Sequence, residues 1–323
     1  MLWAVLGKEH RLGGIAVHGF GRIGRSAVKA ALRDGLWAPS SISDIKDPDT
    51  LAALFEFDTN YGRWPEPVTG SAGTFQIGDH ATQYHDVTGG LPHWGDLGID
   101  LVIDCTGRAT VRSFAEEHLA RGAKRVLVSG PSKTVDDCDA VLLRGVNDAT
   151  YDPDMHRIVS MASCTTNALA PVIHVLRETV GITHGLFSTV HAYTNTQTLT
   201  DQPMADRRDS WAAAENIIPA ASGAAKALAF VWPDLKVTGK AYRVPVRTGS
   251  IVELNAVSAR ATTRDQIVDA FQTAAAEPRW SGVLGVLEGE WPSARIVGET
   301  RSCIVDLPLT QVLGDDLVSV AAW

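Results

Sequence analysis

A glycine-rich turn near the N-terminus constrains the fold of this chain more than any other feature. The apolar run Gly14-Ile15-Ala16-Val17-His18 predicts a short buried strand, and it leads into Gly19-Phe20-Gly21-Arg22-Ile23-Gly24-Arg25 and then a helical pattern. In such a GxGxxG context Gly19 permits the tight turn, Gly21 lets a pyrophosphate approach the backbone, and Gly24 lets the helix pack on the strand. The helix N-terminus would then face the phosphates of a dinucleotide.

An acidic residue follows at the spacing that such a turn requires. A second short strand, residues 41–43, ends at Asp44, which lies 20 residues after Gly24. A carboxylate there can bind both ribose hydroxyls and would repel a 2′-phosphate, which favours NAD over NADP. The alternative is a helix-capping role, but Asp47 is the better-placed cap for the helix expected over residues 50–57. We therefore interpret Asp44 as the ribose ligand.

The rest of the first half alternates strands with helices. Residues 60–100 predict an antiparallel excursion, after which strands are expected over 100–105 and 125–128 with a helix over 111–121 between them. This alternation predicts an α/β, doubly wound parallel sheet whose ligands bind at the carboxyl ends of the strands. Each of the following strand-end residues could merely terminate its strand, but together they are placed to line the nicotinamide side: Thr106, Gly107 and Ser129.

A polar cluster, Ser163-Cys164-Thr165-Thr166-Asn167, stands between an apolar run and a helical pattern. A cysteine at a strand-to-helix junction meets unpaired backbone N–H groups and the helix dipole, which favour the thiolate. The alternative, a buried inert cysteine, is the commoner fate of a lone cysteine. Five polar residues between two apolar segments favour the nucleophile.

Composition excludes several other classes of protein. The 323 residues suffice for two domains, and the net charge of −8 without basic clusters argues against nucleic-acid binding. The four cysteines form no CxxC pair, so we expect no metal site and no disulfides, and the free thiols suit the cytoplasm. No segment reaches the length needed to span a membrane, and the apolar start of the chain is interpreted as an extension, residues 1–13.

Four motifs in one order resemble a known family. The glycine turn, Ala162-Ser163-Cys164-Thr165-Thr166-Asn167, Thr189-Val190-His191-Ala192-Tyr193-Thr194 and Arg243-Val244-Pro245 look like phosphorylating glyceraldehyde-3-phosphate dehydrogenase, from about Ile15 to Trp323. The resemblance implies a Rossmann-type NAD-binding domain over residues 1–163. It also implies an α+β catalytic domain with a mostly antiparallel sheet over residues 164–323.

The resemblance also implies a covalent mechanism with two anion sites. Cys164 would attack the aldehyde carbon with His191 as its base, hydride would pass to NAD, and inorganic phosphate would split the thioester. Thr194 and Arg243 match one phosphate site of the family. The residues that match the other phosphate site are Arg208, Ser163, Thr165, Ser222 and Gly223.

The stretch 195–221 resembles the family's long loop that crosses to the cofactor site of a neighbouring subunit. Pro203 in this loop fits the pattern of NAD-specific members, in agreement with Asp44. By resemblance we expect a homotetramer acting on a phosphorylated aldehyde, with no nucleic-acid or membrane partner.

Several departures from the family pattern leave other functions open. The chain stops where relatives continue with a nicotinamide-binding Asn and a final helix, and His18 and Ser43 each stand where an Asn is usual. Trp211 replaces an arginine of the anion loop, and Arg247 replaces a small residue or a proline. One alternative is a related dehydrogenase for another phosphorylated aldehyde, such as erythrose 4-phosphate. The other is a catalytically weakened binding or regulatory member of the family.

Overall fold

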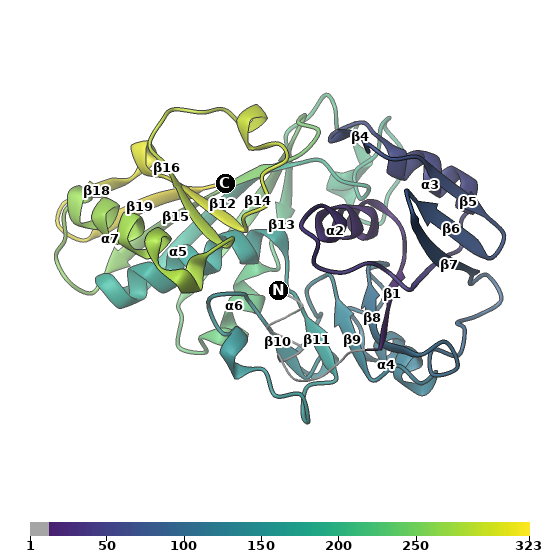
Figure 1. Cartoon of the computed structure of the whole chain (residues 1–323). Coiled ribbons are helices and arrows are strands. Elements are labelled where there is room, and N and C mark those ends of the chain that lie inside the picture. The colour runs from purple at the N-terminus through teal and green to yellow at the C-terminus, as the bar shows by residue number, and fades with distance from the viewer. Residues whose placement is uncertain (1–12) are drawn as a thin grey trace. The chain divides into compact units, whose positions relative to one another are not determined.

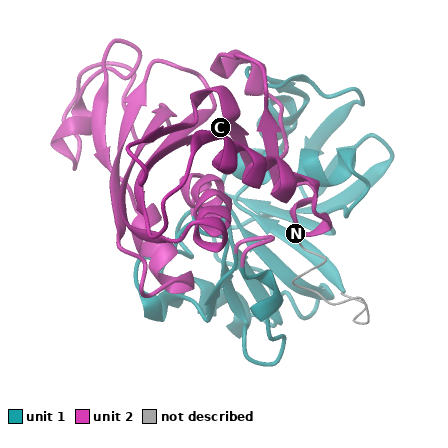
Figure 2. Cartoon of the chain, turned by 90° about the vertical axis from the view of Figure 1, so that its left-hand side faces the viewer, with its two compact units in different colours: residues 1–142, 147–162 teal, residues 143–146, 163–323 magenta. Residues whose placement is uncertain are grey.

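The computed structural model describes residues 13–323, which divide into two compact units (Figure 2). Unit 1 comprises the chain up to Leu142 together with Asn147–Ala162, and unit 2 comprises Leu143–Val146 and Ser163–Trp323. Of the extension expected over residues 1–13, residues 1–12 lie outside the described residues. Among residues 13–323, no helix combines the length and apolar character that crossing a membrane requires.

Unit 1 is built on a nine-stranded sheet within its described residues, with the strand order β10-β11-β9-β8-β1-β2-β7-β6-β5 (Figure 1). Strands β10 through β7 in this order run parallel, and β6 and β5 continue the sheet antiparallel. The predicted doubly wound sheet and its antiparallel excursion are therefore confirmed.

The bounds of the elements of unit 1 follow the expected order. The strands, including the β3–β4 hairpin that stands apart from the sheet, are β1 (Gly14–His18), β2 (Ser41–Asp44), β3 (Phe57–Asp58), β4 (Gly62–Arg63), β5 (Val68–Ser71), β6 (Thr74–Ile77), β7 (His80–Asp86), β8 (Ile99–Asp104), β9 (Arg125–Val128), β10 (Ala140–Val141) and β11 (Ile158–Ser160). The helices are α2 (Arg22–Arg33), α3 (Pro48–Glu56), α4 (Arg112–Ala120), η1 (Val135–Asp137) and η2 (Asp148–Thr150).

Apolar cores cover both faces of this sheet, as a parallel sheet requires. Val17 of β1 packs with α2 and α3 residues such as Val28 and Phe55, whereas its neighbour Ala16 packs with Trp94 and Val102. Successive residues of a strand point to opposite faces, so a continuous apolar run can serve both cores. This explains why the buried strands carry no polar alternation.

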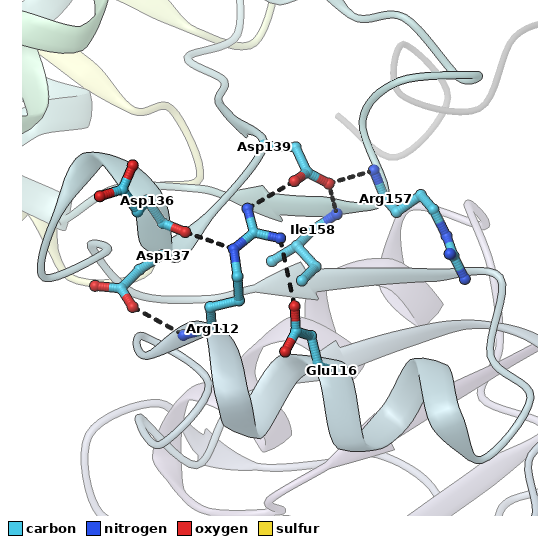
Figure 3. Close-up of polar contacts among 7 residues, drawn as sticks. All are labelled: Arg112, Glu116, Asp136, Asp137, Asp139, Arg157 and Ile158. Carbon is cyan, nitrogen blue, oxygen red and sulfur yellow. Dashed lines mark hydrogen bonds and ion pairs between the residues drawn. The ribbon is translucent and has the colours of Figure 1, made fainter.

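Polar contacts fix the start of α4 in unit 1 (Figure 3). The Arg112 backbone N–H donates to Asp137, and the Arg112 guanidinium forms a 2.7 Å ion pair with Asp139. Asp139 in turn accepts the backbone N–H groups of Arg157 and Ile158, each at 2.8 Å. Burial raises the pKa of Asp139, but the Arg112 guanidinium and these N–H groups hold it below its usual value. The loop before β10 therefore anchors α4 against the strand β11.

Unit 2 contains an eight-stranded, mostly antiparallel sheet within its described residues, in the order β13-β14-β12-β15-β19-β17-β16, with β18 beside β19. Its strands are β12 (Ile182–Ala192), β13 (Ile218–Ala221), β14 (Val237–Val244), β15 (Ser250–Ser258), β16 (Leu284–Leu287), β17 (Cys303–Asp306), β18 (Gln311–Leu313) and β19 (Leu317–Ala322). Its helices are α5 (Cys164–Thr179), α6 (Ala224–Val231), α7 (Arg264–Ala276), η3 (Arg207–Ser210), η4 (Pro278–Trp280), η5 (Ser293–Ile296) and η6 (Leu307–Leu309). Helices α5 and α7 pack on this sheet (Figure 1). The expected mostly antiparallel sheet is confirmed.

Helix boundaries are where the structure departs most from the sequence pattern. The helical pattern of the glycine turn is clear only from Ser26, but α2 already begins at Arg22, with the extended Gly21 as its N-cap. The helix after the polar cluster begins at Cys164 itself and not at the first apolar residue. In both places the first helical turn carries polar or glycine residues, which hides it from a search for apolar periodicity.

Candidate active site

The thiol of Cys164 stands at the first residue of α5. Ser163 is the N-cap of this helix, and its hydroxyl oxygen accepts the Thr166 backbone N–H at 3.0 Å. The Asn167 amide donates to the Ser163 carbonyl oxygen at 2.9 Å and secures the turn. Cys164 is therefore held where free backbone N–H groups and the helix dipole act on its sulfur.

The structure brings Cys164 together with His191, 27 residues later in the chain. The Sγ of Cys164, an exposed residue, lies 3.2 Å from the Nε2 of His191, which is the penultimate residue of β12. Desolvation of the sulfur raises its pKa, but the hydrogen bond and charge of His191 and the Thr165 N–H more than offset this, so the pKa of Cys164 is lowered. A lowered pKa and a neighbouring imidazole are the requirements of a cysteine nucleophile.

Arg243 lies on the other side of the His191 ring. In the parallel pairing of β12 with β14, His191 is directly opposite Arg243, and Arg243 Nη1 lies 2.6 Å from His191 Nδ1. The Ala192 carbonyl oxygen is also within 2.7 Å of Nδ1. Burial lowers the pKa of Arg243, while the Cys164 and Asp209 charges oppose that shift. The imidazole is thus held between a sulfur and a guanidinium.

The backbone before the helix is strained. Ala162, two residues before Cys164, has a φ of 57° and is the one residue other than glycine with a positive φ among residues 13–323. A side chain in this left-handed region costs about 1 kcal/mol. Such strain commonly occurs at functional turns, where the surrounding structure enforces it.

The other residues expected to bind phosphate lie on loops and helix starts of unit 2. Thr194 donates through its backbone N–H and its hydroxyl to Gln197 Oε1, and Gln197 in turn donates to Asp209 at 2.8 Å. The sequence did not single out Gln197, because one amide in a long polar loop carries no recognisable pattern. Arg208 is exposed in η3.

Three smaller residues complete this set. Thr165 is buried in the first turn of α5. Ser222 accepts the Ala224 N–H at 3.3 Å, and Gly223 is the N-cap of α6.

The glycine turn of unit 1 has the geometry that dinucleotide binding requires. Gly19 has a φ of 85°, and a Cβ there would lie 2.8 Å from the Thr106 backbone nitrogen. A Cβ on Gly24 would lie 2.3 Å from the Gly19 carbonyl oxygen, so only glycine allows this close contact of α2 with the turn. A Cβ on Gly21 would meet no atom within 4 Å, which leaves the backbone open to a ligand. Arg22 and Ile23 are exposed at the start of α2.

The Asp44 carboxylate lies beside this turn. One of its oxygens accepts the Phe20 backbone N–H at 2.6 Å, and the other accepts the Lys46 N–H at 3.0 Å. Asp47 is the N-cap of α3 and accepts the Thr50 N–H at 2.8 Å, so the capping role belongs to Asp47, as expected. The Phe20 ring is fully buried and packs on Phe55, so this residue presents its backbone to the turn.

The strand-end residues of unit 1 follow β8 and β9. Thr106 donates through both its N–H and its hydroxyl to Asp104, and Gly107 has a φ of 78°. The Ser129 N–H donates to the Asp104 carbonyl oxygen at 3.0 Å. Pro203 lies on an exposed loop of unit 2.

Comparisons with known proteins agree with these features. Residues 14–112 match the family model described as the glyceraldehyde 3-phosphate dehydrogenase NAD binding domain, and residues 163–323 match the model of its C-terminal domain. The chain is 46% identical to glyceraldehyde-3-phosphate dehydrogenase of Kitasatospora aureofaciens, over 96% of this chain and 93% of that protein. It is 42% identical to glyceraldehyde-3-phosphate dehydrogenase 2 of Streptomyces arenae and 39% identical to the Geobacillus stearothermophilus enzyme, over 96% of this chain and 92% of each relative.

Proposed function

Because this chain belongs to the glyceraldehyde-3-phosphate dehydrogenase family, we propose that it oxidises glyceraldehyde 3-phosphate to 1,3-bisphosphoglycerate through a covalent intermediate on Cys164. It is an NAD-dependent oxidoreductase. The observation that carries the proposed mechanism is the 3.2 Å contact between Cys164 Sγ and His191 Nε2.

The residues of unit 1 fit NAD. Gly21 leaves the backbone open at the start of α2, where a pyrophosphate can accept hydrogen bonds from N–H groups. Asp44 at the end of β2 would bind the adenine ribose, and the Thr106–Gly107 turn and Ser129 would bind nearer the nicotinamide. Bound NAD supplies the acceptor for the hydride that leaves the substrate carbon.

Two residues of unit 2 would carry out the nucleophilic attack and the proton transfers. The Cys164 thiolate attacks the aldehyde carbon, and His191 Nε2 delivers a proton to the carbonyl oxygen, which gives a thiohemiacetal. When the hydride departs, His191 takes the hydroxyl proton and leaves a thioester on Cys164. Inorganic phosphate then attacks the thioester carbon, and the thiolate leaves as an acyl phosphate forms.

Two sets of residues in unit 2 would bind the phosphates. Thr194 and Arg243 form one set, and Arg208 belongs to the other, together with Ser163, Thr165, Ser222 and Gly223. Arginine suits this role because its planar guanidinium can bind two phosphate oxygens at once. Arg243 already contacts His191, so a phosphate bound by Arg243 would lie close to the imidazole.

We further propose a homotetramer in the cytoplasm, with no nucleic-acid or membrane partner. The loop after β12 carries exposed large apolar side chains that a neighbouring subunit would cover, with Leu199 81% exposed and Ile217 69% exposed. The four cysteines are all free, which suits a reducing compartment. Light scattering should give four times the chain mass, and Leu199→Ser with Ile217→Ser should lower it.

Steady-state NADH formation tests the proposed reaction. With glyceraldehyde 3-phosphate the rate should require inorganic phosphate, and Cys164→Ser should lower kcat at least about a thousandfold, because an alcohol ionises far less readily than a thiol. Cys105→Ser is the matched control, since burial raises the pKa of that thiol to about 12, and it should keep its kcat.

Two other results would reject the proposal. Faster, phosphate-independent oxidation of erythrose 4-phosphate would indicate a related dehydrogenase. If calorimetric titration detects no NAD binding although the protein is folded, the chain would be a family member that has lost the reaction.

A further inference from the structure

A buried polar cluster lies under the cofactor turns of unit 1. His18 ends β1 and Asp104 ends β8, and the two residues are directly opposite in the parallel pairing of these strands. His118 of α4 completes the cluster, with its Nε2 3.2 Å from Asp104 Oδ2. Asp104 and His118 are 2% and 1% exposed, so water does not compensate for their polar groups. One ligand atom from each of the three residues lies within 4.8 Å of the others, which is close enough to hold a metal ion.

Trp94 decides what this cluster can do. Its indole Nε1–H is 3.1 Å from His118 Nδ1, and an indole nitrogen only donates. His118 Nδ1 must therefore accept, which places the ring proton on Nε2, facing Asp104. A protonated Nε2 has no lone pair for a metal ion, so the cluster is a directed chain of hydrogen bonds from Trp94 through His118 to Asp104.

The chain continues to the residues that we assign to the cofactor. Asp104 Oδ1 accepts the Thr106 N–H at 2.9 Å and the Thr106 hydroxyl at 2.7 Å. The Thr106 hydroxyl oxygen in turn accepts the Arg108 N–H at 3.0 Å. Burial raises the pKa of Asp104, but the His118 and Thr106 hydrogen bonds hold the pKa below its usual value, so the carboxylate stays ionised.

The helix that carries His118 is itself fixed. Arg112, in the first turn of α4, is bound by Asp137 and Asp139 (Figure 3). His118 therefore approaches Asp104 from an anchored helix, so the 3.2 Å contact joins two elements that are each held in place.

We propose that Trp94, His118 and Asp104 are positioning residues that hold the Thr106–Gly107 turn in the conformation that binds NAD. This inference rests on the proposed function, because the role of the turn in binding NAD belongs to that proposal. A ligand binds more tightly when the turn that receives it is already ordered, because binding then costs less conformational entropy. The chain of hydrogen bonds provides that order in a place that water does not reach.

Asp104→Asn tests this chain of hydrogen bonds by replacing one acceptor oxygen with an NH₂ donor. The introduced amide must present its NH₂ group either to His118 Nε2–H or to the Thr106 N–H, so one contact becomes donor against donor. The Kd for NAD should rise roughly tenfold, with the KM for the aldehyde nearly unchanged. Asp100→Asn, at the other end of β8, is the matched control and should leave the Kd for NAD as in the wild type.

A second substitution should rescue the first. With Trp94→Phe the indole donor is gone, so His118 can move its proton to Nδ1 and accept from the introduced amide through Nε2. The double variant should therefore bind NAD more tightly than Asp104→Asn alone. If the two substitutions caused only independent structural defects, their losses of NAD affinity would instead add. Melting temperatures report whether each variant is folded.

His118→Gln and His118→Leu provide an independent pair if the Trp94 variants fail to fold. The glutamine amide can still donate to Asp104 and should retain most of the NAD affinity, whereas leucine should lose it. If the wild type binds NAD and Asp104→Asn binds it equally well, or if glutamine and leucine behave alike, the inference is wrong and the proposed function stands. If the wild type does not bind NAD, the proposed function itself fails.

Discussion

His191 Nε2 lies 3.2 Å from the sulfur of Cys164, while Nδ1 of the same ring lies 2.6 Å from Arg243 Nη1. One imidazole therefore connects the nucleophile at the start of α5 with a guanidinium on β14. Since the hydrogen bond from His191 is the largest of the effects that lower the pKa of Cys164, the reactivity of the thiol should depend on this ring.

His191→Asn should make the thiol less reactive. Without the imidazole, desolvation of the sulfur dominates and the pKa of Cys164 rises toward or above its ordinary value. The rate of alkylation by iodoacetamide at pH 7 should fall roughly tenfold. The midpoint of the pH profile of this rate should move to higher pH. His156→Asn, which changes a histidine of unit 1, should leave the pH profile of alkylation as it is.

Alanine at two glycines of the same turn should have different effects, a loss of stability at Gly24 and a loss of NAD affinity at Gly21. Gly24→Ala would place a Cβ 2.3 Å from the Gly19 carbonyl oxygen, so the free energy of unfolding should fall by about 3 kcal/mol. Gly21→Ala meets no protein atom within 4 Å, so its melting temperature should stay close to that of the wild type. Its Kd for NAD should nevertheless rise, and an unchanged Kd would show that the pyrophosphate does not approach Gly21.

His18 should make the protein less stable in mild acid. Burial, followed by the His118 ring, lowers the pKa of His18 to about 4, against the opposing charges of Asp104 and Asp44. His18 therefore takes up a proton near pH 6.5 in the unfolded chain, but only near pH 4 in the folded chain. Stability should fall by on the order of 3 kcal/mol between these two values.

Chemical denaturation at several pH values measures this effect. His18→Asn cannot titrate, so its stability should change less between pH 6.5 and 4. Parallel profiles for the two proteins would contradict the buried neutral imidazole.

Ala162→Gly should stabilise the strained turn before the nucleophile. Glycine accepts the φ of 57° without a steric penalty, and the gain is reduced by the greater entropy of glycine in the unfolded chain. We expect the free energy of unfolding to rise by up to about 1 kcal/mol in urea denaturation. Ala168→Gly, in the interior of α5, should instead lower it by about 1 kcal/mol.

Local patterns in the sequence were enough to locate the main elements of unit 1 and the helix that follows the polar cluster. The GxGxxG spacing is a short-range pattern, and the contact of Gly24 with the Gly19 carbonyl oxygen is local, whereas the contact that excludes a side chain at Gly19 comes from Thr106, far along the chain. The capping role of Asp47 is equally local, since its partner Thr50 is three residues later. Apolar periodicity does not mark the first turns of α2 and α5, which carry polar and glycine residues, so the start of α5 was indicated only by the polar cluster around Cys164.

By itself, the amino-acid sequence determined the order of strands and helices in the first half of the chain, the glycine turn and the place of a cysteine at a helix start. Only the tertiary structure decided which atoms meet across the sheets. His191 faces Arg243 because β12 and β14 pair in that register, and His18 faces Asp104 because β1 and β8 do. Strand pairing and helix packing join residues far apart in the chain, so contacts such as those of Trp94 with His118 and of Gln197 with Asp209 exist only once the sheets and loops have assembled.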